Sequence, residues 1–207
     1  IGFVSGGVNY YPTKKIKKIS AVTKMFYEQW DETAYQRYMQ MFKLDENKTP
    51  SQLSAGMKVK YALTLSLSHN AELLILDEPT SGLDPVSRDD LLEVFMRLCD
   101  EGKTILFSTH ITSDLDKCAD NIIYIKNGKI ISEAELKVFE NSYKLVSFDN
   151  EEAAFPVQKY ILGLNRNRNS YTALIESKNA IHFNQKIQNA DIEAIMVHIE
   201  KEAGYDE

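Results

Sequence analysis

Hydrophobic and polar positions first follow a helical period, over the region from Lys14 to Phe42. Asp31 divides this region, because an acidic side chain can cap the start of a second helix. Apolar residues at helical spacing predict the buried faces of the two helices: Ile16, Ile19, Phe26, Tyr27 and Trp30 in the first, and Tyr35, Tyr38, Met39 and Phe42 in the second. A third helix is predicted from Ala55 to Ser68, with Val59, Ala62 and Leu63 on one side.

After the third helix, the helical spacing of apolar residues gives way to short apolar runs, which predict strands separated by helices. Strands are predicted at Leu73 to Leu76, Thr104 to Ser108 and Asn121 to Lys126, the first two unbroken enough to be buried. Between them we expect a helix that starts at Asp84-Pro85, buries Leu91, Val94, Phe95 and Leu98 and ends at Gly102, and a short helix from Thr112 to Cys118. Asn127-Gly128 predicts a hairpin turn that leads to Lys129 to Glu133. This alternation, with the strand-like opening Ile1 to Ser5, predicts an α/β fold with a mostly parallel sheet.

The pattern changes again after about Tyr143. Residues 144–207 contain two short predicted strands, Lys144 to Phe148 and Tyr171 to Glu176, and a final helix from Ala190 to Glu202. We therefore expect two parts, an α/β domain over residues 1–143 and a small α+β appendage over residues 144–207.

Composition narrows the function classes. The chain has 207 residues, 43% of them hydrophobic, and a net charge of -6, which excludes a wholly disordered chain and argues against nucleic acid as a partner. No apolar run is long enough for a membrane span, and no secretory signal is apparent. Lys14-Lys15-Ile16-Lys17-Lys18 is a basic run, either a solvated helix face or a docking patch. Cys99 and Cys118 are expected to be reduced, buried thiols.

Candidate chemistry begins at Asp77-Glu78, which follow the strand Leu73 to Leu76. In an open α/β sheet, ligands bind at the carboxyl ends of the strands. One carboxylate there can hold Mg²⁺ through its water shell, and the other can deprotonate a water that attacks a phosphoryl group. Ser54 is a predicted helix N-cap beside the small residues Ala55 and Gly56, so a phosphate could approach the helix end closely.

The segment LLILDEPTSGLDP, residues 73–85, resembles the extended Walker B and D-loop of ABC ATPases. The resemblance implies that Asp77 holds Mg²⁺, that Glu78 is the catalytic base and that Asp84 lies in a D-loop at a dimer interface. Leu53-Ser54-Ala55-Gly56-Met57 resembles the family's LSGGQ signature, with Ala55 in place of a glycine and Met57 in place of the glutamine. His110 resembles the switch histidine, whereas His69, His182 and His198 are interpreted as structural.

Within the α/β domain, residues 8–70 resemble the helical subdomain that meets a membrane permease, and residues 71–143 the Walker B, D-loop and H-loop core. The stretch from Ile1 to Pro12 resembles the entry to the Q-loop, but Gly6-Gly7 stand where a glutamine is expected, through divergence or a joint in the sequence. No G-x-x-x-x-G-K-[S/T] phosphate loop occurs in the 207 residues. We expect that loop upstream of Ile1, and we expect these residues alone to be inactive.

The resemblance implies a P-loop NTPase-like fold and an ATPase subunit of an ABC transporter, at the cytoplasmic face of the cell membrane. ATP with Mg²⁺ is the implied cofactor. A second ATPase subunit in a head-to-tail homo- or heterodimer and a separate permease are the implied partners, with export as the expected direction. Two alternatives stay open: a non-transport ABC ATPase, and a degenerate subunit that donates only its signature surface.

Overall fold

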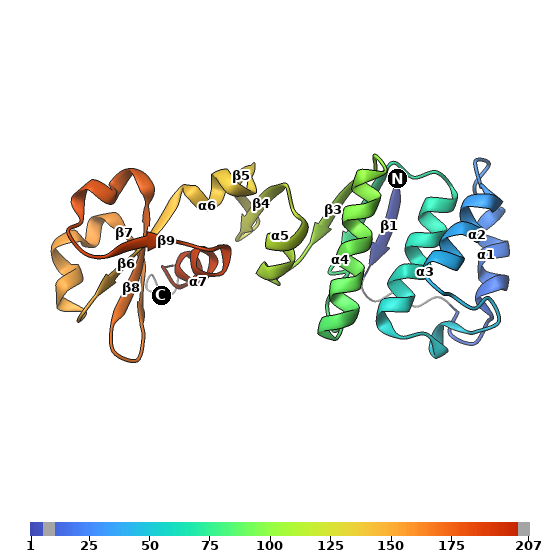
Figure 1. Cartoon of the computed structure of the whole chain (residues 1–207), viewed down its shortest axis with the longest axis horizontal. Coiled ribbons are helices and arrows are strands. Elements are labelled where there is room, and N and C mark those ends of the chain that lie inside the picture. Colours follow the sequence, from blue (N-terminus) through green and yellow to red (C-terminus); the bar gives the residue numbers. More distant parts are fainter. Residues whose placement is uncertain (6–10, 203–207) are drawn as a thin grey trace. The chain divides into compact units, whose positions relative to one another are not determined.

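The computed structural model of the protein describes residues 1–5 and 11–202 (Figure 1). The chain divides into two compact units, Ile1–Cys118 and Ala119–Glu207. The domain boundary that we expected near Tyr143 lies inside the second unit. The division of the chain into a family domain and an appendage at that residue stays a prediction.

A parallel sheet forms the centre of the first unit. Its strands are β1 (Gly2–Ser5), β2 (Leu73–Asp77) and β3 (Thr104–Ser108), in the order β1-β2-β3. The register places Asp77 opposite Ser5 on one side and opposite Ser108 on the other. The predicted parallel pairing is therefore confirmed, and it brings the carboxyl ends of the three strands to one edge.

Only one face of this sheet is well buried among the described residues. Leu74 and Leu76 are buried, in one cluster with side chains of α3 and α4, whereas Leu106 is 51% exposed. The expectation that β2 and β3 are buried on both faces is therefore wrong for the described structure. The reason is that α3 and α4 pack on a single face, while successive side chains of a strand point to opposite faces.

The helical region contains α1 (Ile16–Lys24), α2 (Glu32–Met41), a short 3₁₀ turn η1 (Pro50–Gln52) and α3 (Ala55–Ser68). Asp31 caps α2 as predicted, because its Oδ1 accepts hydrogen bonds from the amides of Thr33 and Ala34 at 2.8 and 3.0 Å. The first helix is shorter than expected. Phe26 lies beyond its end and is 79% exposed, so its predicted place on the buried face is wrong.

Two further helices complete the first unit, α4 (Pro85–Asp100) and α5 (Thr112–Cys118), both as predicted. Gly102 follows α4 with φ of +85°, a conformation that favours glycine after a helix. Cys99 and Cys118 are thiols rather than a disulfide, but Cys99 is exposed and Cys118 is half-buried. The expected burial of both thiols is therefore wrong.

The second unit contains two separate antiparallel sheets. Strand β4 (Asn121–Lys126) pairs with β5 (Lys129–Glu135) across the predicted Asn127-Gly128 turn. It does not join the parallel sheet, which corrects the expectation of a third parallel strand there. Helix α6 (Leu136–Asn141) follows this hairpin.

The larger sheet has the order β7-β8-β6-β9. Strands β6 (Tyr143–Phe148) and β8 (Tyr171–Glu176) agree with the prediction. The sequence analysis missed the elements with weaker patterns: η2 (Glu152–Tyr160), β7 (Ile161–Arg166), η3 (Ser177–His182) and β9 (Ile187–Asn189). The final helix α7 (Ile192–Glu202) begins two residues later than predicted. His198 is buried on it, with Nδ1 2.7 Å from the carbonyl oxygen of Ala194.

Among the residues that the structure describes, none of the helices combines the length and the apolar character that crossing a membrane requires.

A prediction concerns Gly163, in an irregular part of β7. Its φ is +55°, and an added Cβ would lie 2.2 Å from the backbone oxygen of His198. We expect Gly163→Ala to lower the free energy of unfolding by about 2–4 kcal/mol, because strain at positive φ adds to a backbone clash. Urea denaturation measures this change. Gly128→Ala is the matched control, since Gly128 also has positive φ (+72°) but open space around it, and we expect a loss of about 1 kcal/mol. Equal losses in the two variants would contradict the clash.

Candidate functional site

The carboxyl ends of β2 and β3 hold the first part of the site. Asp77 is exposed at the end of β2, and its Oδ1 accepts a hydrogen bond from the Ser108 hydroxyl at 2.9 Å. The same hydroxyl oxygen accepts a hydrogen bond from the backbone amide of Glu78, also at 2.9 Å. Ser108 therefore fixes both the side chain of one acid and the backbone of the next.

Glu78 lies beside His110, which follows β3. The Nδ1 atom of His110 is 3.0 Å from Oε1 of Glu78 and 2.8 Å from Oε2. The imidazole is 70% exposed and the Glu78 side chain 37% exposed. When Nδ1 carries a proton it donates to the carboxylate, and Nε2 on the opposite side of the ring can then bind a ligand. The sequence-predicted base and switch histidine thus form a contact pair.

The backbone at Glu78 is itself unusual. Its φ is +47°, in a region that non-glycine residues rarely adopt. Such conformations cost energy and persist where surrounding contacts hold them, often at functional sites. Here the amide hydrogen bond to Ser108 is one of those contacts.

The predicted D-loop residues Ser81 to Asp84 connect Glu78 to α4. Gly82 has φ of +71°, and the amide of Leu83 donates to the carbonyl of Thr80 at 3.2 Å, so the segment is a tight turn. The Oδ1 atom of Asp84 accepts from the amides of Val86 and Ser87 at 3.1 and 3.0 Å. The hydrogen bond from the Ser87 side chain, and next the one from the Ser87 backbone amide, hold the pKa of Asp84 below its ordinary value. Asp84 is therefore an ionised helix cap at the end of the predicted D-loop.

The predicted signature residues lie at the start of α3. Ser54 and Ala55 are exposed, and the Ser54 Oγ accepts from the amide of Met57 at 3.2 Å, which confirms Ser54 as the N-cap. Gly56 is buried, and a Cβ at this position would lie 3.7 Å from Ser87 and 3.8 Å from Leu83. The signature and the D-loop turn therefore adjoin each other in this unit.

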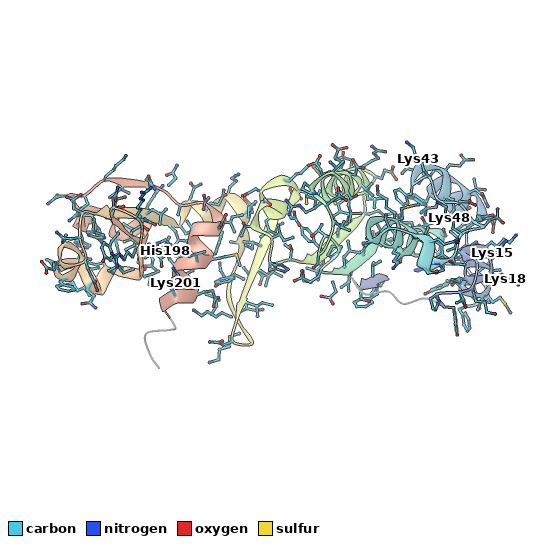
Figure 2. The ribbon with its side chains drawn as sticks, turned by 90° about the horizontal axis from the view of Figure 1, so that it is seen from below. Lys15, Lys18, Lys43, Lys48, His198 and Lys201 are labelled. Carbon is cyan, nitrogen blue, oxygen red and sulfur yellow. The ribbon has the colours of Figure 1, made fainter. Side chains whose placement is uncertain are left out.

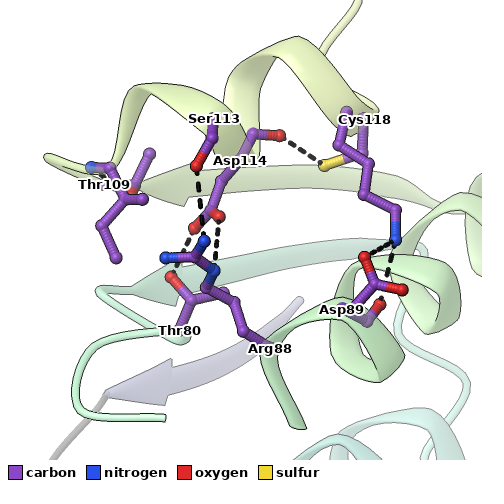
Figure 3. A network of polar contacts seen from close by, with 9 residues as sticks. Thr80, Arg88, Asp89, Thr109, Ser113, Asp114 and Cys118 are labelled. Carbon is purple, nitrogen blue, oxygen red and sulfur yellow. Dashed lines mark hydrogen bonds and ion pairs between the residues drawn. The ribbon is translucent and has the colours of Figure 1, made fainter. Parts of the chain in front are cut away.

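A buried polar network joins the segments that follow β2 and β3 (Figure 3). The Thr80 hydroxyl donates to Oδ2 of Asp114 at 2.7 Å, and both side chains are buried. The Nε atom of Arg88 lies 3.4 Å from Oδ1 of the same carboxylate. Figure 3 shows Thr80, Arg88 and Asp114 converging from the turn, α4 and α5. This network fixes the Glu78 side of the site relative to the His110 side.

The sequence did not reveal this network. Thr80 lies in the recognised segment 73–85 but was given no role there, and Arg88 and Asp114 lie outside every motif that we recognised. Of the predicted site residues, the structure brings Asp77, Glu78 and His110 to one sheet edge. It places Ser54, Ala55 and Gly56 on a different element, beside the turn that ends at Asp84. The predicted Q-loop position at Gly6-Gly7 lies outside the described residues.

The carboxylates of Asp77 and Glu78 at this edge are oxygen ligands of the type that Mg²⁺ prefers. Mg²⁺ is commonly held by one or two carboxylates together with waters and substrate phosphates. In residues 1–5 and 11–202 there is no group of three or more His, Cys, Asp or Glu side chains that could hold a metal ion. A single carboxylate such as Asp77 suits an ion that binds together with phosphates. The described side chains around it do not form a complete protein metal site.

A prediction tests the buried network. We expect Asp114→Asn to lower the free energy of unfolding by about 2–4 kcal/mol, because the change removes the charge that faces Arg88 and weakens the bond from the buried Thr80 hydroxyl. Thermal or chemical unfolding measures the loss. Asp90→Asn is the control, because the Asp90 side chain is 60% exposed and lies 4.0 Å from Lys60, and we expect less than about 1 kcal/mol there. A neutral Asp114→Asn variant would show that the network does not hold these segments.

Comparison with known proteins is consistent with this geometry. Residues 19–115 match a family model described as "AAA domain, putative AbiEii toxin, Type IV TA system". The chain is 42% identical over 106 residues to the lantibiotic transport ATP-binding protein SrtF of Streptococcus pyogenes, covering 51% of this chain and 45% of that protein. It is 40% identical over 91 residues to the energy-coupling factor transporter ATP-binding protein EcfA2 of Ligilactobacillus salivarius, covering 44% of this chain and 32% of that protein. The matched segments thus span less than half the length of these relatives.

Solved structures agree on the fold. An ATP-binding subunit of an ABC transporter superposes with a TM-score of 0.56 at 26% identity, over 67% of this chain and 60% of that one. A dimeric ATP-binding cassette bound to ADP and phosphate superposes with a TM-score of 0.54 at 22% identity, over 65% of this chain and 63% of that one. The homologues of this chain are therefore ATP-binding proteins of ABC transporters, and the chain has the α/β, P-loop NTPase-like fold of their ATPase domains.

Proposed function

We propose that this chain is part of an ATP-hydrolysing subunit of an ABC transporter. The observation that carries the proposal is the contact between Glu78 and His110 beside Asp77 at the carboxyl ends of β2 and β3. A base, a polar imidazole and a carboxylate at one sheet edge suit an attack of water on the terminal phosphoryl group of ATP.

Each side chain has a separate role in this proposal. Asp77 binds Mg²⁺–ATP through the water shell of the ion, which neutralises charge on the phosphates. Glu78 accepts a proton from the attacking water, and the imidazole of His110 holds the carboxylate in place through Nδ1. The Nε2 atom of His110 donates to the γ-phosphate when it carries a proton, and so helps to stabilise the charge that develops there.

Ser54, Ala55, Gly56 and Asp84 act in our proposal across a dimer interface. Ser54, Ala55 and Gly56 lie at the start of α3, whereas Asp77 and Glu78 lie at the sheet edge, on a separate element. In a head-to-tail dimer, the α3 N-terminus of one subunit would face the nucleotide held by the other, where its amides and the helix dipole attract phosphate. The Ala55 methyl narrows that approach relative to glycine, so we expect altered affinity rather than loss of function.

The transport role rests on the relatives. One is named a lantibiotic transport protein, and another is a Nod factor export ATP-binding protein of Neorhizobium galegae, 41% identical over 83 residues. We propose that the subunit drives export through a separate permease, from the cytoplasmic face of the membrane, with the helical region of residues 11–70 as the docking part.

The base assignment gives a direct test. In the full-length protein, we expect Glu78→Gln to lower ATP turnover by at least about a hundredfold, because the amide cannot accept the water's proton. ATP binding should be retained, because the amide keeps the shape of the side chain. Steady-state phosphate release and equilibrium binding of ATP measure the two effects. Glu93→Gln on the exposed face of α4 is the control, with unchanged turnover. Undiminished turnover in Glu78→Gln would refute the assignment.

A mixing experiment tests the shared site. Glu78→Gln and Ser54→Arg subunits are each expected to be inactive as homodimers. In a mixed dimer, one site combines the intact Glu78 of one subunit with the intact Ser54 of the other, so partial turnover should return. If both residues served the nucleotide of their own subunit, every site would carry one defect. Phosphate release that stays at the level of the separate variants would therefore contradict the proposal.

A further inference from the structure

An exposed surface on the helical region combines lysines with apolar side chains. We call it the α1 surface and define it by Lys14, Lys15, Lys17, Lys18, Val22, Met25 and Phe26. The proposal below goes beyond the proposed function, because it gives this one surface of the helical region a contact in addition to the permease.

The lysines of the α1 surface lie at the N-terminal end of the helix, where positive charge lowers helix stability. Lys14 and Lys15 directly precede α1, and Lys17 and Lys18 lie in its first turn, where the helix dipole is positive and no acidic residue stands. All four are exposed. In the part of the chain that the structure describes, no carboxylate forms an ion pair with any of them. Stability of the fold therefore does not account for this charge.

Neighbouring groups leave the positive charge largely uncompensated. The segment 46–48 packs against the start of α1, since the carbonyls of Lys48 and Glu46 accept from the amides of Ile16 and Lys17 at 2.9 and 3.1 Å. This contact adds a lysine next to the four, and Figure 2 shows Lys15, Lys18 and Lys48 at this end of the helical region. The Glu46 carboxylate faces the hydroxyl of Tyr35. Burial, and to a smaller extent this carboxylate, raise the pKa of Tyr35 to about 12.

The apolar side chains of the α1 surface are exposed to solvent. Met25 is 82% exposed, Phe26 79% and Val22 54%. Lys18 and Val22 lie at i and i+4 on α1, and Met25, at i+7, is the C-cap residue with φ of -66° and ψ of -16°, so lysine and apolar groups follow one another on one side of the helix. The backbone behind them is ordered by hydrogen bonds from Met25 to Val22 and from Phe26 to Thr23.

The turn between α1 and α2 is also fixed by contacts with the C-terminal end of α3. Tyr27 stacks on His69 with ring centroids 3.9 Å apart, and the amide of Asp31 donates to the carbonyl of Ser68 at 2.7 Å. Lys24 pairs with Glu32 at 2.7 Å. The exposure of Met25 and Phe26 is thus a fixed property of the fold, and a large apolar group fixed in water marks an interaction surface.

We propose that the α1 surface binds the headgroup region of an anionic lipid bilayer. Lysines attract the negative surface potential of such a leaflet, and the apolar side chains next to them enter the boundary with the acyl chains. The net charge of the chain is -6, so this local basic patch opposes the charge of the rest of the sequence. Charge complementarity with phosphate headgroups, together with the exposed side chains of Val22, Met25 and Phe26, favours a lipid surface over an acidic protein groove.

The test is cosedimentation of the full-length protein with vesicles of phosphatidylcholine containing phosphatidylglycerol, compared with phosphatidylcholine alone. We expect binding to the anionic vesicles only, weakened by added salt. Lys15→Gln/Lys18→Gln should reduce the affinity about 25-fold, at about fivefold per lysine. Phe26→Ser should reduce it about tenfold.

Matched controls lie in the second unit. Lys129→Gln/Lys186→Gln removes two other exposed lysines, and Ile181→Ser removes an apolar side chain that is 86% exposed. These variants should bind vesicles like the unaltered protein, as should Glu78→Gln, whose defect is in turnover alone. Failure of the unaltered protein to bind anionic vesicles would overturn the proposal, and so would equal losses in the control variants. Retained turnover with lost vesicle binding separates this proposal from the proposed function.

Discussion

The register between β2 and β3 is the constraint on which the candidate site depends. Because Asp77 pairs with Ser108 across the parallel ladder, the Ser108 hydroxyl reaches both the Asp77 carboxylate and the Glu78 amide. A shift by one residue would turn this hydroxyl to the other face of the sheet and remove both hydrogen bonds. It would also move His110 away from Glu78, since His110 follows β3 by two residues. Pairing of backbone groups therefore sets the geometry of the acidic and imidazole groups.

Stability and function make opposing demands at this edge. Glu78 has a left-handed backbone, and Asp114 is a buried carboxylate, and each of these costs free energy by itself. The buried cluster of α3, α4 and β2 supplies the compensating stability. The strained residue lies in the segment between two fixed points, Ser108 and the Thr80–Asp114 contact, so its conformation is determined from both sides.

Local sequence patterns predicted most of the first unit. Asp31, Ser54 and Asp84 each cap the helix that their residue type and position suggested, because capping is a short-range interaction. The same holds for the Asn127-Gly128 turn. Long-range features were not predictable in this way. Periodicity alone did not reveal that β4 leaves the parallel sheet, or that Phe26 lies in a turn, since those outcomes depend on which surfaces the rest of the chain covers. For the site, the motif residues were identified, but the network of Thr80, Arg88 and Asp114 was not.

Helix α3 has a mechanical consequence for the helical region. It is one uninterrupted helix of 14 residues, about 21 Å long, with Ser54 at its start and His69 just past its end. The stacking of Tyr27 on His69, and the hydrogen bond from Asp31 to Ser68, fasten the turn after α1 to that far end. A helix of this length behaves as a stiff rod, so a force applied to the turn tilts α3 as a whole. A displacement at either end of α3, at Ser54 or at His69, is therefore transmitted over the full length of the helix.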